Sequence, residues 1–162
     1  MNKNSDVTYK TMGVQKHIAL IAHDNCKNDL IDWIIENKTE LSSHFLCGTG
    51  TTASLIAKKT GLPVTAYNSG PLGGDQQIGS RIAEGKIDFL IFFWDPLAAQ
   101  PHDPDVKALL RVAVLYDIPV AMNKTTADFL LRSPLMKSEY ARTIINYEKR
   151  IKNRVDDISN NI

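Results

Sequence analysis

Short apolar runs that alternate with helical patterns constrain the fold of this chain more than any other feature of its sequence. Each run has four to six residues and is followed by a turn and then by apolar positions at helical spacing, as at Leu30, Ile31 and Ile34. A strand that helices cover on both faces has this character, because neither face meets water. The sequence therefore predicts a three-layer α/β/α domain around a doubly wound, five-stranded parallel sheet, with strands at residues 17–22, 44–47, 64–67, 89–93 and 119–122.

The two ends of the chain depart from this alternation. Residues 1–16 are polar and show no periodic apolar positions, so we expect a flexible N-terminal leader there. Residues 17–162 are expected to form a single domain, because the length and composition favour one ordinary core. Beyond Pro134 the pattern predicts one more helix, which carries on its apolar positions Ile144, Ile145, Ile151 and Val155.

Charge and cysteine content argue against several classes of partner. The 19 lysines and arginines nearly balance the 18 aspartates and glutamates, so the net charge of +1 gives no basic footprint for nucleic acid. The longest strongly apolar run, 89–94, has six residues against the roughly 20 of a membrane span. The N-terminus has no apolar core of a secretory signal. Cys26 and Cys47 lack zinc-site spacing and are too few for a disulfide framework, which indicates the cytoplasm.

In a doubly wound sheet, ligands bind outside the carboxyl ends of the strands, so the turns there form the candidate site. The segment GTGTTA at 48–53 formally matches the Gly-x-Gly-x-x-Ala dinucleotide pattern, but 64–71 holds no carboxylate for a ribose. It is not a Walker loop either, because no Lys-Ser/Thr follows in place. Hydroxyls beside the free N–H groups of a helix start suit a phosphate; they belong to Thr49, Thr51 and Thr52. The alternative is that Thr51 only caps the helix.

The turn SGPLGGDQQ at 69–77 places three glycines around an aspartate at a helix start. Such glycines let backbone N–H groups approach a ligand closely. The sequence leaves two interpretations of Asp75 open: it caps the helix, or it acts as a catalytic base. A carboxylate that is partly desolvated in a pocket has a raised pKa and accepts a proton more readily near neutral pH.

The turn at 94–105 gathers a histidine and several carboxylates, namely Asp95, His102, Asp103 and Asp105. A histidine beside carboxylates is a candidate proton donor or shuttle, because its unperturbed pKa lies near neutral pH. The alternative is a solvated loop in which Asp103 caps the following helix. The sequence alone does not choose between these two interpretations.

The turn after the first predicted strand mixes the same groups, with His23, Asp24 and Cys26 next to Lys27. Lys27 falls in the first turn of its helix, where it either joins a phosphate pocket or is simply solvated. A metal site of His23, Cys26, His102 and an aspartate is conceivable, but none of the usual metal-binding spacings supports it.

Five segments, taken together and in order, resemble the methylglyoxal synthase family at the spacing of that family. The resemblance covers about residues 16–134 and is far more specific than the glycine turn alone. The segments are AHDNCK at 22–27, GTGTT at 48–52, SGPLGGDQQIG at 69–79, IDFLIFFWDPL at 87–97 and PHDPDVKALLR at 101–111.

The resemblance implies a fold of the flavodoxin-like class and a lyase that converts dihydroxyacetone phosphate into methylglyoxal and inorganic phosphate, without a metal or organic cofactor. It also implies a cytoplasmic homohexamer of the glycolytic bypass that phosphate inhibits, often cooperatively. Asp75 matches the proton-abstracting carboxylate, while His102 and His23 match histidines at the substrate. Further matching active-site carboxylates are Asp24, Asp95 and Asp105. Phosphate and substrate contacts match Lys27, Thr49, Gly50, Thr51, Thr52, Ser69 and Gly70.

Elementary chemistry agrees with these implications. Removing a weakly acidic proton next to a carbonyl needs a positioned base, here Asp75, and donors to the developing oxyanion, here His102 with His23. The enediolate then expels phosphate if the C–O bond stands roughly perpendicular to its plane, whereas an isomerase holds that bond in the plane. The residues alone leave isomerase and lyase open, and the resemblance favours the lyase.

Two other functions remain as alternatives. The same fold resembles the allosteric domain of carbamoyl phosphate synthetase, so one alternative is a regulatory module that binds small anions. A cyclohydrolase domain of purine synthesis has a related fold, but this chain lacks the accompanying transformylase portion. The intact GGDQQ and PHDPD turns favour an enzyme.

Overall fold

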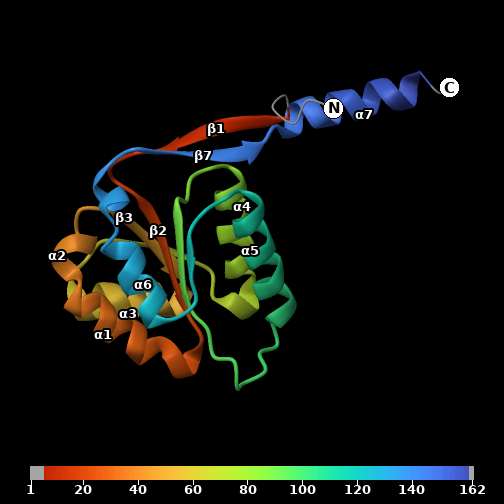
Figure 1. The fold of residues 1–162 in the computed structure, drawn as a ribbon. Helices are drawn as coiled ribbons and strands as arrows, with labels where there is room; N and C mark the ends of the chain where they lie inside the picture. The colour runs from red at the N-terminus through yellow and green to blue at the C-terminus, as the bar shows by residue number, and fades with distance from the viewer. Residues whose placement is uncertain (1–5, 161–162) are drawn as a thin grey trace.

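The computed structural model describes residues 6–160 and is built around a five-stranded parallel sheet with the strand order β4-β3-β2-β5-β6 (Figure 1). Neighbouring strands in this sheet all pair in parallel. Each predicted strand overlaps an observed one, so the predicted doubly wound sheet is confirmed. The strands are β2 (His17–Ala22), β3 (Phe45–Thr49), β4 (Val64–Tyr67), β5 (Phe89–Phe93) and β6 (Val120–Ala121).

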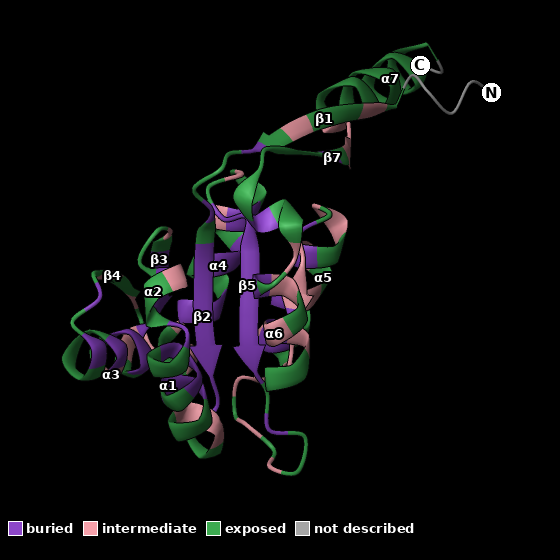
Figure 2. Ribbon diagram, turned by 60° about the vertical axis from the view of Figure 1, so that its left-hand side comes forward, coloured by how far each residue is buried: buried purple, intermediate pink, exposed green. Residues whose placement is uncertain are grey.

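Helices cover both faces of this sheet and complete the three layers. Along β2, Ile18 and Leu20 enter one core, while Ala19 and Ile21 enter the other. Figure 2 shows β2 and β5 buried over most of their length, which explains their nearly continuous apolar sequence. One face is covered by α1 (Lys27–Glu36), α3 (Gly50–Thr60) and α6 (Lys124–Leu131), and the other by α4 (Gly74–Ala83) and α5 (Asp103–Leu115). Four short helices complete this part of the domain, the 3-10 helices being labelled η: η2 (Asp24–Cys26), α2 (Lys38–Leu41), η3 (Gly70–Leu72) and η4 (Pro134–Lys137).

The strand order reverses beside β2, and this reversal positions the site. The chain runs outward from β2 through β3 to β4, then returns to β5 on the other side of β2. The connections that leave β2 and β5 therefore diverge and open a crevice at the carboxyl edge of the sheet. Just beyond the two strands, the backbone N–H of His23 still donates to the carbonyl oxygen of Phe93 at 3.1 Å.

A two-stranded antiparallel ribbon lies outside the sheet, where the sequence predicts a flexible leader. In it β1 (Val7–Met12) pairs along its length with β7 (Tyr140–Ile145). The leader prediction is therefore wrong for residues 7–12, whereas residues 1–5 lie outside the described part of the chain. The polar composition misleads because only two of the twelve ribbon residues are buried, and cross-strand hydrogen bonds define the ribbon instead of an apolar core.

The last helix, α7 (Tyr147–Ser159), follows the ribbon and projects away from the body (Figures 1 and 2). Ile151 and Val155 lie on it as predicted, but Ile144 and Ile145 belong to β7, so the predicted helix begins too early. None of its residues, 147 to 159, is buried. Neither α7 nor any other helix within residues 6–160 has the length and hydrophobicity to cross a membrane.

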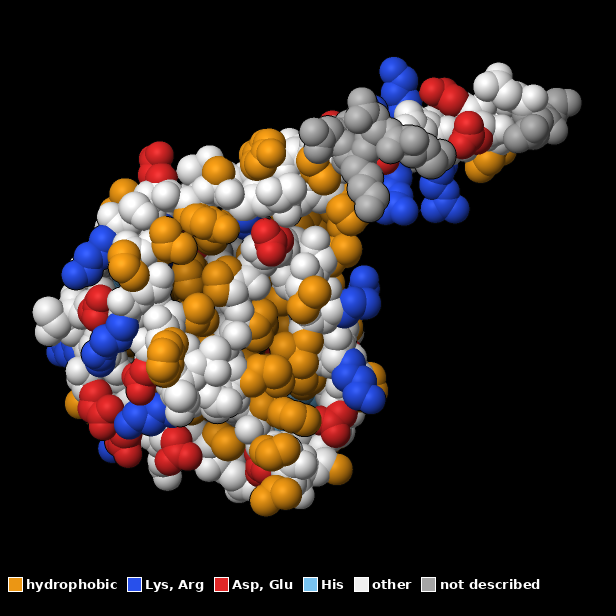
Figure 3. Space-filling view, viewed as in Figure 1, with side chains coloured by type: hydrophobic (Ala, Val, Ile, Leu, Met, Phe, Trp, Pro, Cys, Tyr) orange, Lys and Arg blue, Asp and Glu red, His pale blue; other side chains and the backbone are white. Residues whose placement is uncertain are grey.

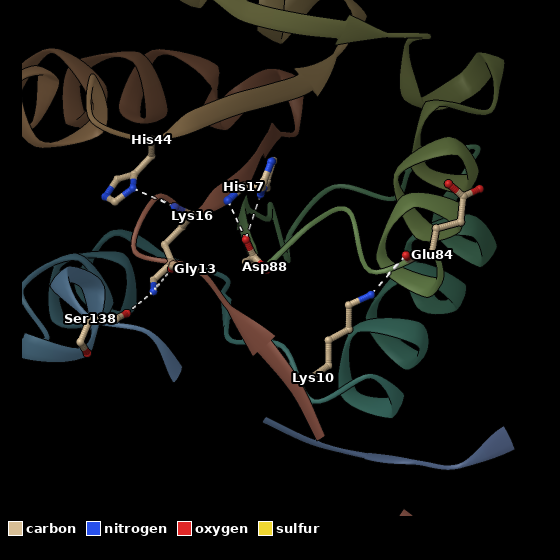
Figure 4. Close-up of polar contacts among 8 residues, drawn as sticks. All are labelled: Lys10, Gly13, Lys16, His17, His44, Glu84, Asp88 and Ser138. Carbon is tan, nitrogen blue, oxygen red and sulfur yellow. Dashed lines mark hydrogen bonds and ion pairs between the residues drawn. The ribbon is translucent and has the colours of Figure 1, made fainter. Parts of the chain in front are cut away.

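Lys16 ties the ribbon to the body. Its side chain is buried, and Nζ donates to the carbonyl oxygens of Gly13 at 2.5 Å and Ser138 at 2.6 Å (Figure 4). Gly13 follows β1 and Ser138 precedes β7. One ammonium group therefore holds both connections of the ribbon.

We expect Lys16→Met to lower the free energy of unfolding by about 2 kcal/mol, because two carbonyl oxygens lose a charged donor. Urea denaturation followed by circular dichroism measures this change. Lys107→Met removes an exposed lysine of α5 and serves as the control, with an expected effect below about 0.5 kcal/mol. Equal stabilities of the two variants would contradict the role given to Lys16.

Candidate active site

A cavity of about 190 Å³ opens at the carboxyl edge of the sheet, beside the end of β2. Turns from four parts of the chain supply its wall, which brings together most of the residues singled out from the sequence. The predicted residues that line it are His23, Asp24, Lys27, Thr49, Thr51, Thr52, Ser69, Gly70, Asp75 and His102. Ile21, Ala22, Pro71 and Gln100 complete the lining.

Asp75 lies in the first turn of α4 with its side chain 1% exposed. It does not cap this helix: the N-cap residue is Gly73, in the left-handed region at φ 88°, and α4 has no side-chain cap among the described residues. The Asp75 Oδ2 atom lies 3.6 Å from His102 Nε2 and has no hydrogen-bond partner within residues 6–160. Burial raises the pKa of the Asp75 carboxyl, and this effect outweighs the lowering by His102.

His102 is the N-cap residue of α5, and the glycine turn before α4 makes room for it. A Cβ atom added at Gly70 would lie 2.7 Å from His102 Nε2 and 3.2 Å from Asp75 Oδ2. A residue larger than glycine would therefore force the two side chains away from their present positions. The glycine in this turn allows the carboxyl and the imidazole to approach each other.

His23 follows β2 and is fixed as a neutral hydrogen-bond donor. The backbone N–H of Asp95 donates to His23 Nδ1 at 3.1 Å, so the neutral ring carries its proton on Nε2. Burial lowers the pKa of His23, and His102 lowers it further. Nε2 is buried without a partner in the described chain, and the two imidazoles meet edge to face with ring centroids 5.7 Å apart. This N–H is available to an oxygen atom bound in the cavity.

The start of α3 and Lys27 lie together in one part of the cavity wall. Lys27 Nζ donates to Thr51 Oγ1 at 3.3 Å and to the exposed carboxylate of Asp24 at 2.5 Å. The N-cap residue Thr49 makes no side-chain cap, and Thr51 lies two positions beyond the N-cap, inside α3. The interpretation of Thr51 as a simple cap is therefore wrong. First-turn N–H groups without a side-chain cap favour a bound anion.

Three predicted site residues lie outside the lining. Asp95 accepts a hydrogen bond from Asn25 Nδ2 at 2.7 Å and contributes to the site through its backbone N–H. Asp105 lies in a hollow behind Asp75 and accepts from Gln76 Nε2 at 2.9 Å. Gly50 begins α3, and its N–H donates to a backbone carbonyl instead of the cavity.

Sequence reasoning missed Gln100 and considered a metal site that the structure does not assemble. Gln100 lies in the turn at 94–105 but has no charge and belongs to no motif, so only its proximity to His102 along the chain hinted at the cavity. Cys26 lines a different hollow from His23 and His102. No group of three or more metal-ligating side chains within residues 6–160 is arranged to hold an ion.

Comparison with known proteins connects this geometry to a family. A family model described as an MGS-like domain matches residues 29–122. The methylglyoxal synthase of Clostridium acetobutylicum is 62% identical over 141 residues, which cover 87% of this chain and 97% of that protein. The methylglyoxal synthase of Pectobacterium atrosepticum is 55% identical over 150 residues, which cover 93% of this chain and 99% of that protein. A crystal structure of methylglyoxal synthase from Elizabethkingia anophelis superposes with a TM-score of 0.84 at 48% identity, covering 90% of this chain and 95% of that one.

We expect Lys27→Met to weaken the binding of inorganic phosphate about tenfold, a loss of about 1.4 kcal/mol, because the dianion loses its cationic partner. Isothermal titration calorimetry at constant ionic strength measures the dissociation constant. Lys38→Met, at an exposed position of α2, is the matched control and should bind like the parent. Equal affinities of all three proteins would mean that phosphate does not bind beside Lys27.

Proposed function

This chain belongs to the methylglyoxal synthase family, and we propose that it eliminates phosphate from dihydroxyacetone phosphate to give methylglyoxal. The observation that carries the proposal is the buried Asp75 carboxyl 3.6 Å from His102 in one cavity with Lys27 and the start of α3. Asp75 and His102 can move protons at the carbonyl end of a three-carbon ketose phosphate. Lys27 and the N-terminus of α3 can bind its phosphate group.

In the first step, the Asp75 carboxylate takes a proton from the hydroxymethyl carbon, and the electrons of that C–H bond form the enediolate. The raised pKa makes this carboxylate a stronger base than an exposed aspartate. The neutral His23 donates from Nε2 to the oxygen that becomes negative. His102 carries a proton between the two enediolate oxygens.

In the second step, the oxygen on the terminal carbon forms an aldehyde, the double bond shifts towards the phosphate-bearing carbon, and the C–O bond to phosphate breaks. Phosphate takes up the proton that Asp75 removed from carbon and leaves as its dianion, which restores the carboxylate. The remaining enol takes up a proton on its methylene carbon, releases its hydroxyl proton and becomes methylglyoxal. We call Lys27, Thr51 and the first turn of α3 the phosphate cradle. Elimination requires that the breaking C–O bond stand perpendicular to the enediolate plane, and the cradle fixes this orientation by holding the phosphate group.

The phosphate cradle also supports regulation by inorganic phosphate. The Asp24–Lys27 ion pair is exposed on its acidic side, and exposed ion pairs contribute little stability. A phosphate group can therefore replace Asp24 as the partner of Lys27 at little cost. Because product phosphate fits the same place as the substrate's phosphate group, it should inhibit competitively.

The assay is direct: purified protein is incubated with dihydroxyacetone phosphate, and methylglyoxal and phosphate are measured together. Equal amounts of both, above the uncatalysed rate, support the proposal. Glyceraldehyde 3-phosphate as the product would indicate an isomerase. Binding of phosphate without turnover would favour the regulatory module.

We expect Asp75→Asn to lower kcat by several orders of magnitude, because an amide cannot accept the proton. The same variant should be more stable than the parent at neutral pH. Burial raises the carboxyl's pKa in the folded protein above its ordinary value of 3.8, so ionised Asp75 destabilises the fold. This cost is full above the folded-state pKa and disappears below about 3.8.

The stability gain of Asp75→Asn should therefore shrink as the pH falls through that window. Urea denaturation at a series of pH values measures the gain. Near-parental turnover would reject Asp75 as the base, and a gain that did not vary with pH would reject the raised pKa.

We further propose that the chain forms a homo-oligomer, for which the resemblance implies six subunits. The apolar side chains of α7 lie at helical spacing but remain exposed: Ile151 by 62%, Val155 by 54% and Ile158 by 61%. An isolated helix of this length is marginally stable in water. Figure 3 also shows hydrophobic side chains gathered in a band down the face of the body. Such exposed apolar surface is typical of a contact between subunits.

We expect the double variant Ile151→Ser, Val155→Ser to sediment as a smaller species than the parent, because it removes the apolar stripe of α7. Sedimentation velocity at micromolar concentration measures the mass. Lys152→Ser, an exposed polar change on the same helix, is the control. A monomeric parent protein would contradict self-association.

The proposed compartment is the cytoplasm. Cys26 and Cys47 are free thiols, which suits a reducing environment. Burial raises the pKa of Cys26 and raises that of Cys47 to about 12, so neither is a ready thiolate.

A further inference from the structure

Each strand of the ribbon places a cation at the end of a helix in the body. Lys10 of β1 and Arg142 of β7 are direct cross-strand partners. Lys10 Nζ donates to the carbonyl oxygen of Glu84, the C-cap residue of α4, at 3.3 Å (Figure 4). Arg142 Nη1 donates to the carbonyl oxygen of Tyr116, the C-cap residue of α5. One cross-strand pair thus holds the ends of two helices.

These two helices carry the proton-transfer pair at their opposite ends. Asp75 lies in the first turn of α4, and His102 is the N-cap residue of α5. The helices lie side by side (Figure 1) and contribute buried side chains to the same core, including Ile78 and Ile82 of α4 and Leu109 of α5. The helix α4 has 10 residues and α5 has 13, so their lengths are about 15 and 20 Å. A shift at the C-terminal ends therefore reaches the site.

We propose that Lys10 and Arg142 are positioning residues, which hold the C-terminal ends of α4 and α5 and thereby set the approach of Asp75 to His102. This inference rests on the proposed function, in which these two side chains move the protons. The connecting path is two rigid helices in contact, which is a physical route for coupling between distant positions.

The burial of Arg142 costs folding free energy, so a stabilising role does not explain this residue. Its side chain is 1% exposed, and its Nε and Nη2 atoms have no partner among residues 6–160. A cation at a helix C-terminus is favourable, but a buried guanidinium with unpaired donors costs free energy that an apolar side chain would not. Local features that cost stability commonly serve function.

The path of Lys10 is also specific. Its side chain passes over Gly85, which ends α4 in the left-handed region at φ 70°, and occupies the space that a Cβ atom would fill there. Lys86 offers a matched control: it pairs with the Glu84 carboxylate at 2.8 Å, and within residues 6–160 this ion pair does not involve the ribbon.

The test compares Arg142→Met with Arg142→Lys. We expect Arg142→Met to fold with an unchanged or higher Tm, to lose about tenfold in kcat, and to keep KM within about twofold, because a small misplacement of reacting groups lowers turnover strongly. Arg142→Lys should recover part of the loss. Lys10→Met should act in the same direction with a smaller effect, and Lys86→Met should behave like the parent.

The pH profile of kcat/KM separates positioning from a general loss of folding. The charged and titratable groups around Asp75 are His102 and Asp105 from α5, with His23, Asp24 and Lys27 elsewhere on the cavity wall. His102 lowers the pKa of Asp75, so moving it away should shift the acid limb of the profile to higher pH. A variant that only reduced the folded fraction would leave this limb in place.

Unchanged kcat and an unchanged acid limb in folded Arg142→Met and Lys10→Met would overturn the inference. A lower kcat with a fixed acid limb and no rescue by lysine would also overturn it. If the parent makes no methylglyoxal, the proposed function fails on its own. The inference is then tested by carbon-detected NMR titration of the Asp75 carboxyl, whose midpoint should rise in Arg142→Met and stay unchanged in Lys86→Met; a fixed midpoint in Arg142→Met would overturn it.

Discussion

The Asp75 carboxyl is held out of water beside His102, and the chemistry of the site depends on this arrangement. Burial disfavours the ionised carboxylate and raises its pKa, which makes a stronger base, while the imidazole 3.6 Å away keeps the ionised form accessible. The pair can meet only because Gly70 leaves the space that any Cβ atom would take from the imidazole. Ionised Asp75 therefore weakens the fold, and in the proposed reaction this carboxylate is the base.

The other groups divide the remaining work by their own environments. His23 stays neutral because it is buried and because the Asp95 N–H occupies its Nδ1 atom, which leaves a donor for the oxyanion. Lys27 and the uncapped start of α3 provide positive potential for phosphate. The parallel sheet makes this division possible, since the turns after β2, β3, β4 and β5 all open on one edge. Groups from distant parts of the chain therefore face a single cavity.

The parts predictable from the sequence are those with a local signature. Continuous apolar runs identify β2 and β5, which are buried on both faces. Ten of the cavity's lining residues are predictable from the turns that follow the strands. The ribbon has no such signature, because its residues pair across 128 to 138 positions of sequence, as Lys10 does with Arg142. The role of Asp95 was assigned to its carboxylate, but its backbone N–H orients His23. Backbone contacts of this kind depend on loop geometry and leave no mark on residue type. Gln100 is missed for a different reason, because it has no charge and belongs to no motif.

The most direct measurement is the titration of the Asp75 carboxyl itself, by carbon-detected NMR of the parent with Asp75→Asn used to assign the signal. If the buried carboxyl is the base, its pKa lies above 3.8, the ordinary value, and coincides with the acid limb of the pH profile of kcat/KM. A carboxyl that titrates at or below 3.8, or an acid limb that does not follow it, would contradict the account.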